Sequence, residues 1–451
     1  MTDFAYRELA AHLLEKARAC GATDADVVVA DGANFSVQVR LSAVDRLTKA
    51  REKRLGLRVF FGKRSASAST SDFSKDSLDR LVSETCALAA AVAADEHSGL
   101  PAPDELAGRD LPALDLYDPT ELDTETQIAL ARRAEAAAMA LDPRITNSEG
   151  ADFNSSSGRV ILGNTRGFLG EYRSSSFSVS VTPIAMGPDG QGMQRDFWYA
   201  VGRKYAGLES PESVGQEAAR RTLRRLGARK IVTQRVPIVF DPETAASLLS
   251  NLCSAVSGSA VYKGASFLIG QLGKRLAPER VTVYDDGLLV GGLGSRPFDG
   301  EGLPTRKTTV VEKGILKNYL LDTYSARKLG LTSTGNAARS VGDSPSVGPT
   351  NFYLLPGDRD PKEIIASVKQ GLYVTELIGF GINMATGDYS RGAAGLWIEN
   401  GELAYPVEEI TIAGNLKQMF ADIEMVGNDL VFRGRIASPT IKIGEMTIAG
   451  N

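Results

Sequence analysis

The stretch Phe35-Ser-Val-Gln-Val-Arg-Leu41 alternates strictly between apolar and polar side chains. Its apolar residues fall on one face of an extended chain, and Ser36, Gln38 and Arg40 fall on the other. A two-residue period of this kind predicts a β-strand with one buried and one solvated face, which is typical of antiparallel sheets. We therefore expect the fold to be built around antiparallel strands.

Neighbouring segments extend this strand into a domain. Two further strands, at about 55–61 and 64–71, meet at the short turn Gly62-Lys63, which marks a hairpin. Residues 3–19, which end at Cys20-Gly21, and residues at about 76–94 place apolar side chains at helical spacing. These elements predict an N-terminal α/β domain over residues 1–98.

A second unit follows a proline-containing segment. Residues 99–119 show little periodicity and are interpreted as a linker, and a middle α+β domain is predicted over residues 120–230. Thr124-x-x-Gln127 has the pattern of a capping box and predicts the start of a helix. A helix from Ser210-Pro211 to about 226 would close this domain. Strands are expected at about 146–153, 159–164, 168–183 and 196–205.

Residues 231–451 are predicted to form a C-terminal β-rich domain. Asp241-Pro242 supplies a cap and a first-turn proline for a helix at about 242–257. Asn400-Gly401, between two apolar runs, predicts a hairpin. The predicted fold class is α+β: an N-terminal α/β domain with antiparallel hairpins, followed by predominantly antiparallel β domains with a few helices. The pentapeptide Thr-Ile-Ala-Gly-Asn occurs twice, at 411–415 and 447–451.

The composition argues against some classes of function, such as general binding to nucleic acid or to membranes. The chain has 451 residues, with 51 Lys and Arg against 55 Asp and Glu, for a net charge of −4. General electrostatic affinity for nucleic acid or an anionic membrane is therefore not expected, and the basic cluster Lys49–Arg54 is interpreted as a solvated hairpin tip. No signal-peptide pattern or apolar run of ~18 residues is evident. The three separated cysteines suit a reducing compartment, so we expect a cytoplasmic protein.

Residues that could carry chemistry are scarce. The chain has two histidines, His12 and His97, both in its first quarter, so imidazole chemistry is not expected in the rest. Cys253 lies within an apolar helical pattern, where an inert core thiol is expected. No pattern typical of a zinc site or of a phosphate-binding loop occurs.

Two weaker patterns remain as alternatives. Ser325-x-x-Lys328 would place a lysine amine one helical turn from a hydroxyl. Asp285-Asp286 together with Asp299 and Glu301 could bind a hard cation, although a turn at the end of a strand also explains the first pair. The residues by themselves indicate a multi-domain α+β protein without a recognisable catalytic constellation.

Longer motifs resemble a known family. The segments GFGINMATGDYSR (379–391), GLWIENGE (395–402) and PVEEITIAGNL (406–416) are similar to those of the TldD/PmbA family, also called modulator of DNA gyrase. The earlier segments GLRVFFG (56–62), GNTRG (163–167) and YKGASF (262–267) resemble the same family. The resemblance covers nearly the whole chain in order.

The resemblance implies one of two kinds of subunit. The TldD kind resembles a zinc peptidase, with a His-Glu-x-x-x-His helix and a later cysteine, whereas the PmbA/TldE kind lacks these ligands. In this sequence the corresponding positions are Leu249, Ser250 and Ser254, and the terminal loop at 426–434 contains no cysteine. The resemblance therefore implies no metal in this chain, with zinc expected in a TldD-type partner.

The function implied is that of a metal-free PmbA/TldE-like subunit in a metallopeptidase complex that degrades or processes unfolded peptides. This chain would form part of the dimer and of the peptide channel, and would be inactive without its TldD-type partner. It could form a homodimer when alone. Two alternatives stay open: a non-enzymatic homodimeric adaptor related to gyrase or antitoxins, and a metal-independent hydrolase.

A glycine-rich segment is the candidate for the peptide path or the subunit interface. From Gly379 to Arg391 the sequence lacks the apolar content of a core, so a loop tethered to a sheet is expected. Glycines in such a loop allow close approach of a ligand backbone. A surface loop that only connects strands is the alternative. The candidate residues are Gly379, Gly381, Asn383, Gly387, Asp388, Tyr389 and Arg391.

Overall fold

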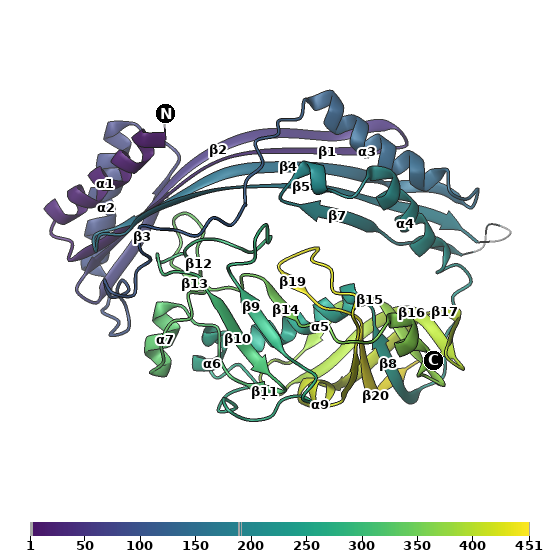
Figure 1. Ribbon diagram of the computed structural model, residues 1–451. Coiled ribbons are helices and arrows are strands. Elements are labelled where there is room, and N and C mark those ends of the chain that lie inside the picture. The colour runs from purple at the N-terminus through teal and green to yellow at the C-terminus, as the bar shows by residue number, and fades with distance from the viewer. Residues whose placement is uncertain (1–2, 188–189, 191, 451) are drawn as a thin grey trace.

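The structure is a computed structural model, and it describes residues 3–187, 190 and 192–450. Strands dominate, most of them antiparallel, with helices packed on their faces, so the predicted α+β fold class is confirmed. A long arched sheet lies above a C-terminal β-rich unit (Figure 1). No helix in the described part of the chain is long and apolar enough to cross a membrane.

The arched sheet takes its strands from both sides of the segment 99–119. Over the described residues its order is β3-β2-β1-β4-β5-β6, and β7 also pairs with β5. All of the pairings within this sheet are antiparallel. The strands are β1 (Asp24–Arg40), β2 (Ala43–Phe61), β3 (Arg64–Thr70), β4 (Ile145–Asn164), β5 (Leu169–Met186), β6 (Met193–Arg195) and β7 (Trp198–Gly202).

The strands are longer than the sequence predicts. The expected strand at 35–41 is the second half of β1, and the strands expected at 146–153 and 159–164 form the single strand β4. The interpretation of Lys49–Arg54 as a hairpin tip was wrong, because this cluster lies within β2 opposite Ala30–Phe35. The tip falls instead at Leu41 and Ser42, both of which have positive φ.

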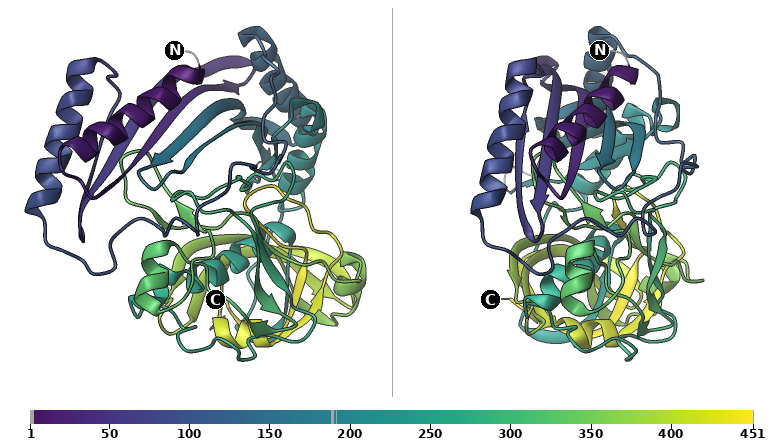
Figure 2. Two further views of the ribbon diagram at one scale, coloured as in Figure 1. Left: turned by 60° about the vertical axis from the view of Figure 1, so that its left-hand side comes forward. Right: turned by 90° about the vertical axis from the view of Figure 1, so that its left-hand side faces the viewer.

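Four helices cover the outer, convex face of the arch (Figure 2). Alternate residues of β1 point to this face: Val27 and Val29 pack beneath α1 and α2, and Phe35, Val37 and Val39 pack beneath α3 and α4. The helix α3 begins after the cap Asp123, whose side chain accepts from the Thr126 N–H, rather than at a Thr124 cap. The helices are α1 (Asp3–Ala19), α2 (Lys75–Ala91), α3 (Thr124–Met139) and α4 (Pro211–Leu223).

The segment 99–119 contains no helix or strand, but it is packed against the body of the protein. Leu100, Leu114 and Leu116 are buried. The Ala107 N–H donates to the Gly302 carbonyl at 2.8 Å, which ties the segment to the C-terminal unit. The segment therefore connects the two halves of the arched sheet while following the surface of the lower unit.

The C-terminal unit contains a closed ring of strands. Its larger sheet has the order β17-β16-β15-β8-β20-β18, and an additional pairing between β17 and β20 closes the ring. That pairing joins the two Thr-Ile-Ala-Gly copies, with Thr411 opposite Ala449 and Ala413 opposite Thr447. The Asn400-Gly401 hairpin is confirmed between β16 and β17. The strands are β8 (Gln234–Phe240), β15 (Gln370–Ile382), β16 (Asp388–Glu399), β17 (Glu402–Asn415), β18 (Ile423–Val426) and β20 (Ile441–Ala449).

A second sheet, of order β11-β10-β9-β14-β19, packs with this ring and with helix α5 around one core. Its strands are β9 (Val283–Asp286), β10 (Lys307–Glu312), β11 (Ile315–Leu316), β14 (Phe352–Leu354) and β19 (Ile436–Ala437). The strands β12 (Ala337–Ala338) and β13 (Ser346–Val347) form a small hairpin. The helices are α5 (Pro242–Ala255), α6 (Gly258–Tyr262), α7 (Thr323–Leu329), α8 (Pro361–Ala366) and α9 (Leu416–Ala421).

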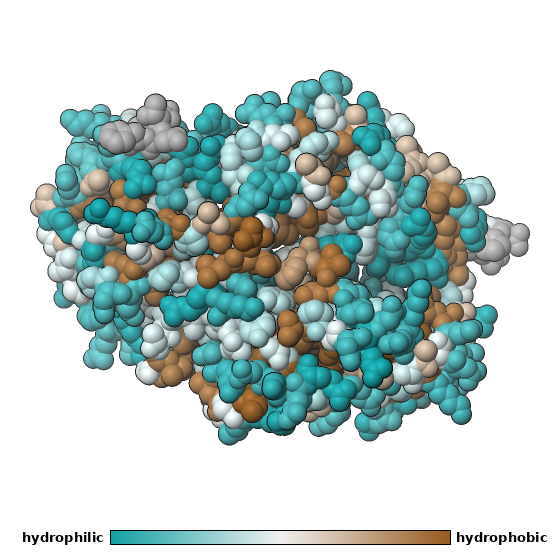
Figure 3. Space-filling model, viewed as in Figure 1, coloured by the Kyte–Doolittle hydropathy of each residue, from teal (hydrophilic) through white to brown (hydrophobic). Residues whose placement is uncertain are grey.

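The concave face of the arched sheet lies against the C-terminal unit. Val28 and Leu162, on the inner face of β1 and β4, pack with Phe168 and with Phe298 of the C-terminal unit. In Figure 3, apolar residues gather in the middle of the view, where the two layers meet. We call this contact between the inner face of the arch and residues 296–302 and 339–341 the seam.

Candidate functional site

Helix α5 is the element on which the family would carry its metal ligands. Asp241 caps it by accepting from the Thr244 N–H at 2.9 Å, and Pro242 occupies its first turn. Leu248 and Leu252 are buried in the core that both C-terminal sheets share. The helix is therefore held as a rigid central element, as a metal-bearing helix would have to be.

The three positions predicted for the lost motif hold no metal ligand. Leu249 is buried in the core. The Ser250 hydroxyl donates to the Ser247 carbonyl at 2.6 Å, and the Ser254 hydroxyl donates to the Ser250 carbonyl at 2.9 Å. Among the described residues there is no group of three or more His, Cys, Asp and Glu side chains that could hold a metal ion. These residues do not fit a zinc ion, which needs imidazole, thiolate or carboxylate ligands.

A cavity of about 400 Å³ lies at the end of this helix. Its lining includes Cys253, Ser254, Ser257, Lys263 and Gly348. Burial raises the pKa of the Cys253 thiol, so the thiol stays protonated and is a poor nucleophile. This agrees with the inert thiol expected from the sequence.

The Ser325 and Lys328 pair has a structural explanation. Ser325 is fully buried, and its hydroxyl donates to the Asp322 carboxylate at 2.5 Å. The Ser325 N–H donates to the same carboxylate, and in return the Asp322 N–H donates to the Ser325 hydroxyl oxygen at 3.2 Å, which makes a capping box at the start of α7. The Lys328 ammonium lies 3.9 Å from Asp95 instead. The hydroxyl is thus engaged in holding a helix terminus.

Two of the carboxylates considered for a cation site, Asp285 and Asp299, likewise accept hydrogen bonds from nearby loops. Asp285 accepts from the Thr350 hydroxyl at 2.8 Å and from the Asn336 amide at 2.6 Å. Asp299 accepts three backbone N–H groups, from Glu301, Leu303 and Ala337. Burial raises the pKa of both Asp285 and Asp299. Their oxygens are occupied by protein donors, which explains them without a cation.

The glycine-rich segment forms a hairpin rather than the expected loop. β15 continues to Ile382 and β16 begins at Asp388, with Gly381 opposite Ser390 and Ile382 opposite Tyr389. The turn between them is short, and the Gly387 N–H donates to the Asn383 carbonyl at 2.7 Å. The segment is therefore part of the wall of the closed ring of strands, which we call the barrel.

Two expectations about this segment were wrong. Tyr389 is 2% exposed and packs in the core that both C-terminal sheets share. Arg391 is only partly exposed and donates to the Ser247 hydroxyl at 2.9 Å and to the Leu377 carbonyl at 3.2 Å. Asp388 is exposed as expected and accepts from the Thr386 hydroxyl at 2.6 Å.

The most unusual residue of this hairpin was not singled out from the sequence. Phe380 is 94% exposed and Ile378 is 56% exposed. The strand register shifts between Ile378 and Gly381, so Gly379 and Phe380 bulge out of the ladder. A phenylalanine flanked by two glycines is the signal in the sequence that could have indicated such a bulge.

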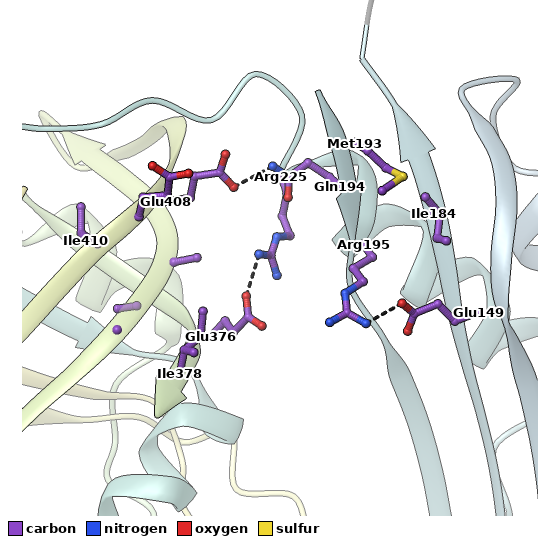
Figure 4. A pocket seen from close by; sticks show the side chains of 14 residues that line it. Glu149, Ile184, Met193, Gln194, Arg195, Arg225, Glu376, Ile378, Glu408 and Ile410 are labelled. Carbon is purple, nitrogen blue, oxygen red and sulfur yellow. Dashed lines mark hydrogen bonds and ion pairs between the residues drawn. The ribbon is translucent and has the colours of Figure 1, made fainter. Parts of the chain in front are cut away.

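The base of the hairpin borders a cavity of about 580 Å³ between the arch and the barrel (Figure 4). One wall comes from β4, β5 and the edge strand β6, and the other from β15, β16 and β17. Gly392, Ala393 and Ala394 supply a stretch of small residues in the barrel wall. The other lining residues are Glu149, Ile184, Met193, Gln194, Arg195, Arg225, Glu376, Ile378, Glu408, Glu409 and Ile410.

Paired charges border this cavity, which we call the edge cavity. Arg195 pairs with Glu149 at 2.5 Å on the arch, and Arg225 pairs with Glu376 at 2.6 Å next to the barrel. The Gln194 amide donates to Glu408 at 2.7 Å across the gap. None of the described lining residues is Ser, Cys or His. The edge cavity is suited to binding rather than to nucleophilic chemistry.

Family models match in order along almost the whole chain. They are the PmbA/TldA metallopeptidase domain 1 at residues 25–91, the central domain at 117–226 and the C-terminal domain at 233–450. The fold and these matches define the class of protein as a metallopeptidase-type scaffold in three parts.

Relatives agree with these matches. The chain is 41% identical to the metalloprotease PmbA of Escherichia coli O157:H7, over 96% of this chain and 94% of that protein. It is 36% identical to a PmbA homologue of Haemophilus influenzae, over 99% and 96%. A crystal structure from Bacteroides thetaiotaomicron, named a modulator of DNA gyrase, superposes with a TM-score of 0.92 at 29% identity, over the full length of both chains. The chain belongs to the PmbA/TldD metallopeptidase family.

Proposed function

We propose that this chain is the metal-free, PmbA-type subunit of a two-subunit peptidase complex and that it acts on unfolded peptides. The observation that carries the proposal is the chemistry of α5. A chain with the complete family scaffold places Leu249, Ser250 and Ser254 where the resemblance implies His, Glu and His, and two of the three use their hydroxyls on their own helix. Peptide-bond hydrolysis would therefore depend on a TldD-type partner that carries the ligands and the zinc.

The contribution of this chain would be to hold extended peptide. The edge strand β6 and the small residues 392–394 face the edge cavity from its two sides. An unpaired strand edge binds an extended backbone largely through main-chain hydrogen bonds, which tolerate many sequences. Residues without bulky side chains let that backbone approach closely. This arrangement suits a substrate that is unfolded rather than one with a particular sequence.

Partner binding would use the bulge of the β15–β16 hairpin. A phenylalanine that is 94% exposed gains by being buried in a partner, and aromatic side chains are frequent anchors of protein interfaces. The bulge is fixed to the barrel on both sides by paired strands, so little ordering cost is paid on binding. Assembly would take place in the cytoplasm, which suits three cysteines that form no disulfide.

The proposal is tested by co-purifying this chain with a TldD-type subunit and measuring zinc in each chain by elemental analysis. We expect stoichiometric zinc in the partner and none in this chain. Hydrolysis of an unfolded protein substrate should require both chains and be abolished by a chelator. One tight zinc per copy of this chain, or chelator-resistant hydrolysis by this chain alone, would refute the proposal.

An assembly measurement separates the proposal from the adaptor alternative. Light scattering of the chain alone, of the partner alone and of the mixture gives the composition of each species. The proposal expects a mixed dimer that forms at the expense of any homodimer. A homodimer that persists unchanged in the presence of the partner would favour an independent adaptor.

A further inference from the structure

A separate cavity of about 200 Å³ lies in the seam, away from α5 and from the edge cavity. Val28 and Val160 line it from the inner face of the arch, and Phe298 and Gly300 line it from the C-terminal unit. Arg339, which also lines it, follows β12, and Figure 1 draws β12 beneath the arch. At roughly 30 Å³ for each water, the cavity has room for several waters or for one small organic molecule.

Arg296, which lines this cavity, carries donors without acceptors. Its Nε and Nη2 atoms are buried and have no hydrogen-bond partner among the described residues. Asp299, the acid in the same lining, already accepts three backbone N–H groups. Buried donors of a charged group that stay unpaired cost more free energy than neutral ones. An acceptor from outside the protein would remove this cost.

Arg339 adds a further donor from a second element. Its side chain is 2% exposed, its Nη1 donates to Asp26 at 2.6 Å and its Nε donates to the Asp343 carbonyl at 3.0 Å. Its Nη2 atom is buried and has no partner within the described chain. Two guanidinium groups with spare donors therefore line one small cavity.

Apart from Ser340, the remaining lining is mostly apolar. Val28, Val160, Leu162 and Phe298 line the cavity, together with the ring of Tyr172. We propose that the seam cavity binds a small carboxylate, whose oxygens accept from Arg296 and Arg339 and whose apolar part lies against Val28, Leu162 and Phe298. Guanidinium groups bind carboxylates through paired, charge-assisted hydrogen bonds, and the apolar walls favour a ligand with a hydrocarbon group. This inference is independent of the proposed peptidase role.

The first test compares two probes of nearly equal shape. Isothermal titration of the full chain with isovalerate should show saturable binding in the millimolar range or tighter, whereas isovaleramide, which has no negative charge, should bind at least ~10-fold more weakly. Equal binding of the two probes, or no binding of isovalerate, would overturn the proposal. Inorganic phosphate binding as tightly as isovalerate would also overturn it, because the apolar walls would then contribute nothing.

Variants identify the site. Arg296→Gln removes the unpaired guanidinium while leaving the Arg339–Asp26 pair in place, and it should weaken isovalerate binding ~10-fold or more. Arg306→Gln, an exposed arginine outside the cavity lining, is the matched control and should bind as the wild type does. Ala30→Leu should fill the cavity from β1 and also abolish binding. If Arg296→Gln and Ala30→Leu fold and both bind isovalerate normally, the seam cavity is not the site.

Discussion

Arg339 reaches across the seam and donates from Nη1 to Asp26 at 2.6 Å, joining two residues that are 313 positions apart in the sequence. Asp26 also accepts from Arg58 Nε at 3.0 Å, so one carboxylate on β1 holds two guanidinium groups. Burial by itself would raise the pKa of Asp26, but the charges of Arg339 and Arg58 hold it below its usual value. The arch and the C-terminal unit are thus fastened by a buried ionic cluster.

Loss of this carboxylate should be strongly destabilising. Asp26→Asn leaves Arg58 and Arg339 buried without a counter-charge, and removing one partner of a buried pair typically costs about 3–5 kcal/mol. Chemical denaturation should show this loss in the free energy of unfolding. Asp142→Asn removes an exposed ion pair with Arg144 and is the control that should change stability little. A similar, small effect for both variants would show that the seam does not depend on the cluster.

Glu301 should make stability depend on pH near neutrality. Burial, and next the charge of Asp299, raise the pKa of Glu301 to about 7 from 4.5. Because the folded state holds this proton where the unfolded state has lost it, stability should fall as pH rises from about 4.5 to about 7. Glu301→Gln cannot lose the proton, so its stability should fall less over that range. If the free energy of unfolding depends on pH in the same way for the wild type and for Glu301→Gln, this assignment is contradicted.

Gly170 marks a close approach at the seam. A Cβ atom there would lie 2.5 Å from Phe168 Cζ and 2.6 Å from Phe298 Cε1. Gly170→Ala should therefore force these rings apart and cost about 1–3 kcal/mol, measured by thermal or chemical unfolding. Gly207→Ala, where a Cβ would meet nothing within 4 Å, is the matched control. If Gly170→Ala is as stable as Gly207→Ala, the rings have room to move that the structure does not show.

Alanine substitutions of Phe380 and Tyr389 should affect different properties: the first should weaken assembly with the partner, and the second should lower the stability of the fold. Phe380→Ala removes an exposed ring, so stability should change within about ±0.5 kcal/mol while assembly with a TldD-type partner weakens. Tyr389→Ala empties a core position and should cost about 3–5 kcal/mol in the free energy of unfolding. Val290→Ala, at an apolar position that is 67% exposed, controls for general loss of surface hydrophobicity. Normal assembly of Phe380→Ala would exclude the bulge as the partner contact.

Ser325→Ala should affect stability and not turnover. The hydroxyl donates to Asp322 within the capping box of α7, and loss of such a bond typically costs about 1 kcal/mol. Melting temperature should fall modestly, while peptide hydrolysis by the assembled complex should match the wild type below that temperature. Loss of hydrolysis in a folded complex would revive the Ser/Lys hydrolase alternative.

Arg391 corrects an expectation about the hairpin. The sequence grouped it with Asp388 as a candidate peptide-path or interface residue in an expected loop. The structure binds its guanidinium to Ser247 of α5 and to the Leu377 carbonyl, which fastens the hairpin to the helix. An effect of Arg391→Ala on assembly therefore has to be separated from an effect on folding. Asp388 is exposed, so Asp388→Ala should change stability little, and its effect on assembly or turnover can be measured directly.

Local patterns predicted the elements well where periodicity and caps were clear. The alternation of 35–41, the Asn400-Gly401 turn and the Asp241-Pro242 start of α5 were all found, because each depends on interactions within a few residues. The strand β4 was broken in two because Asn154–Gly158 is polar on both faces. Its strand conformation comes from backbone pairing with β1 on one side and β5 on the other, which no local pattern reveals.

By itself, the sequence determined the α+β class, the family motifs and the absence of imidazole and carboxylate at 249, 250 and 254, since these follow from residue identity and short spacing. Only the tertiary structure decided that Tyr389 is buried while Phe380 is exposed, because a register shift within one hairpin turns neighbouring side chains in opposite directions. Likewise it alone placed Arg339 beside Asp26 and left Arg296 with unpaired donors. Those contacts depend on how two distant sheets dock, and docking is determined by the packing of the whole chain rather than by any single segment.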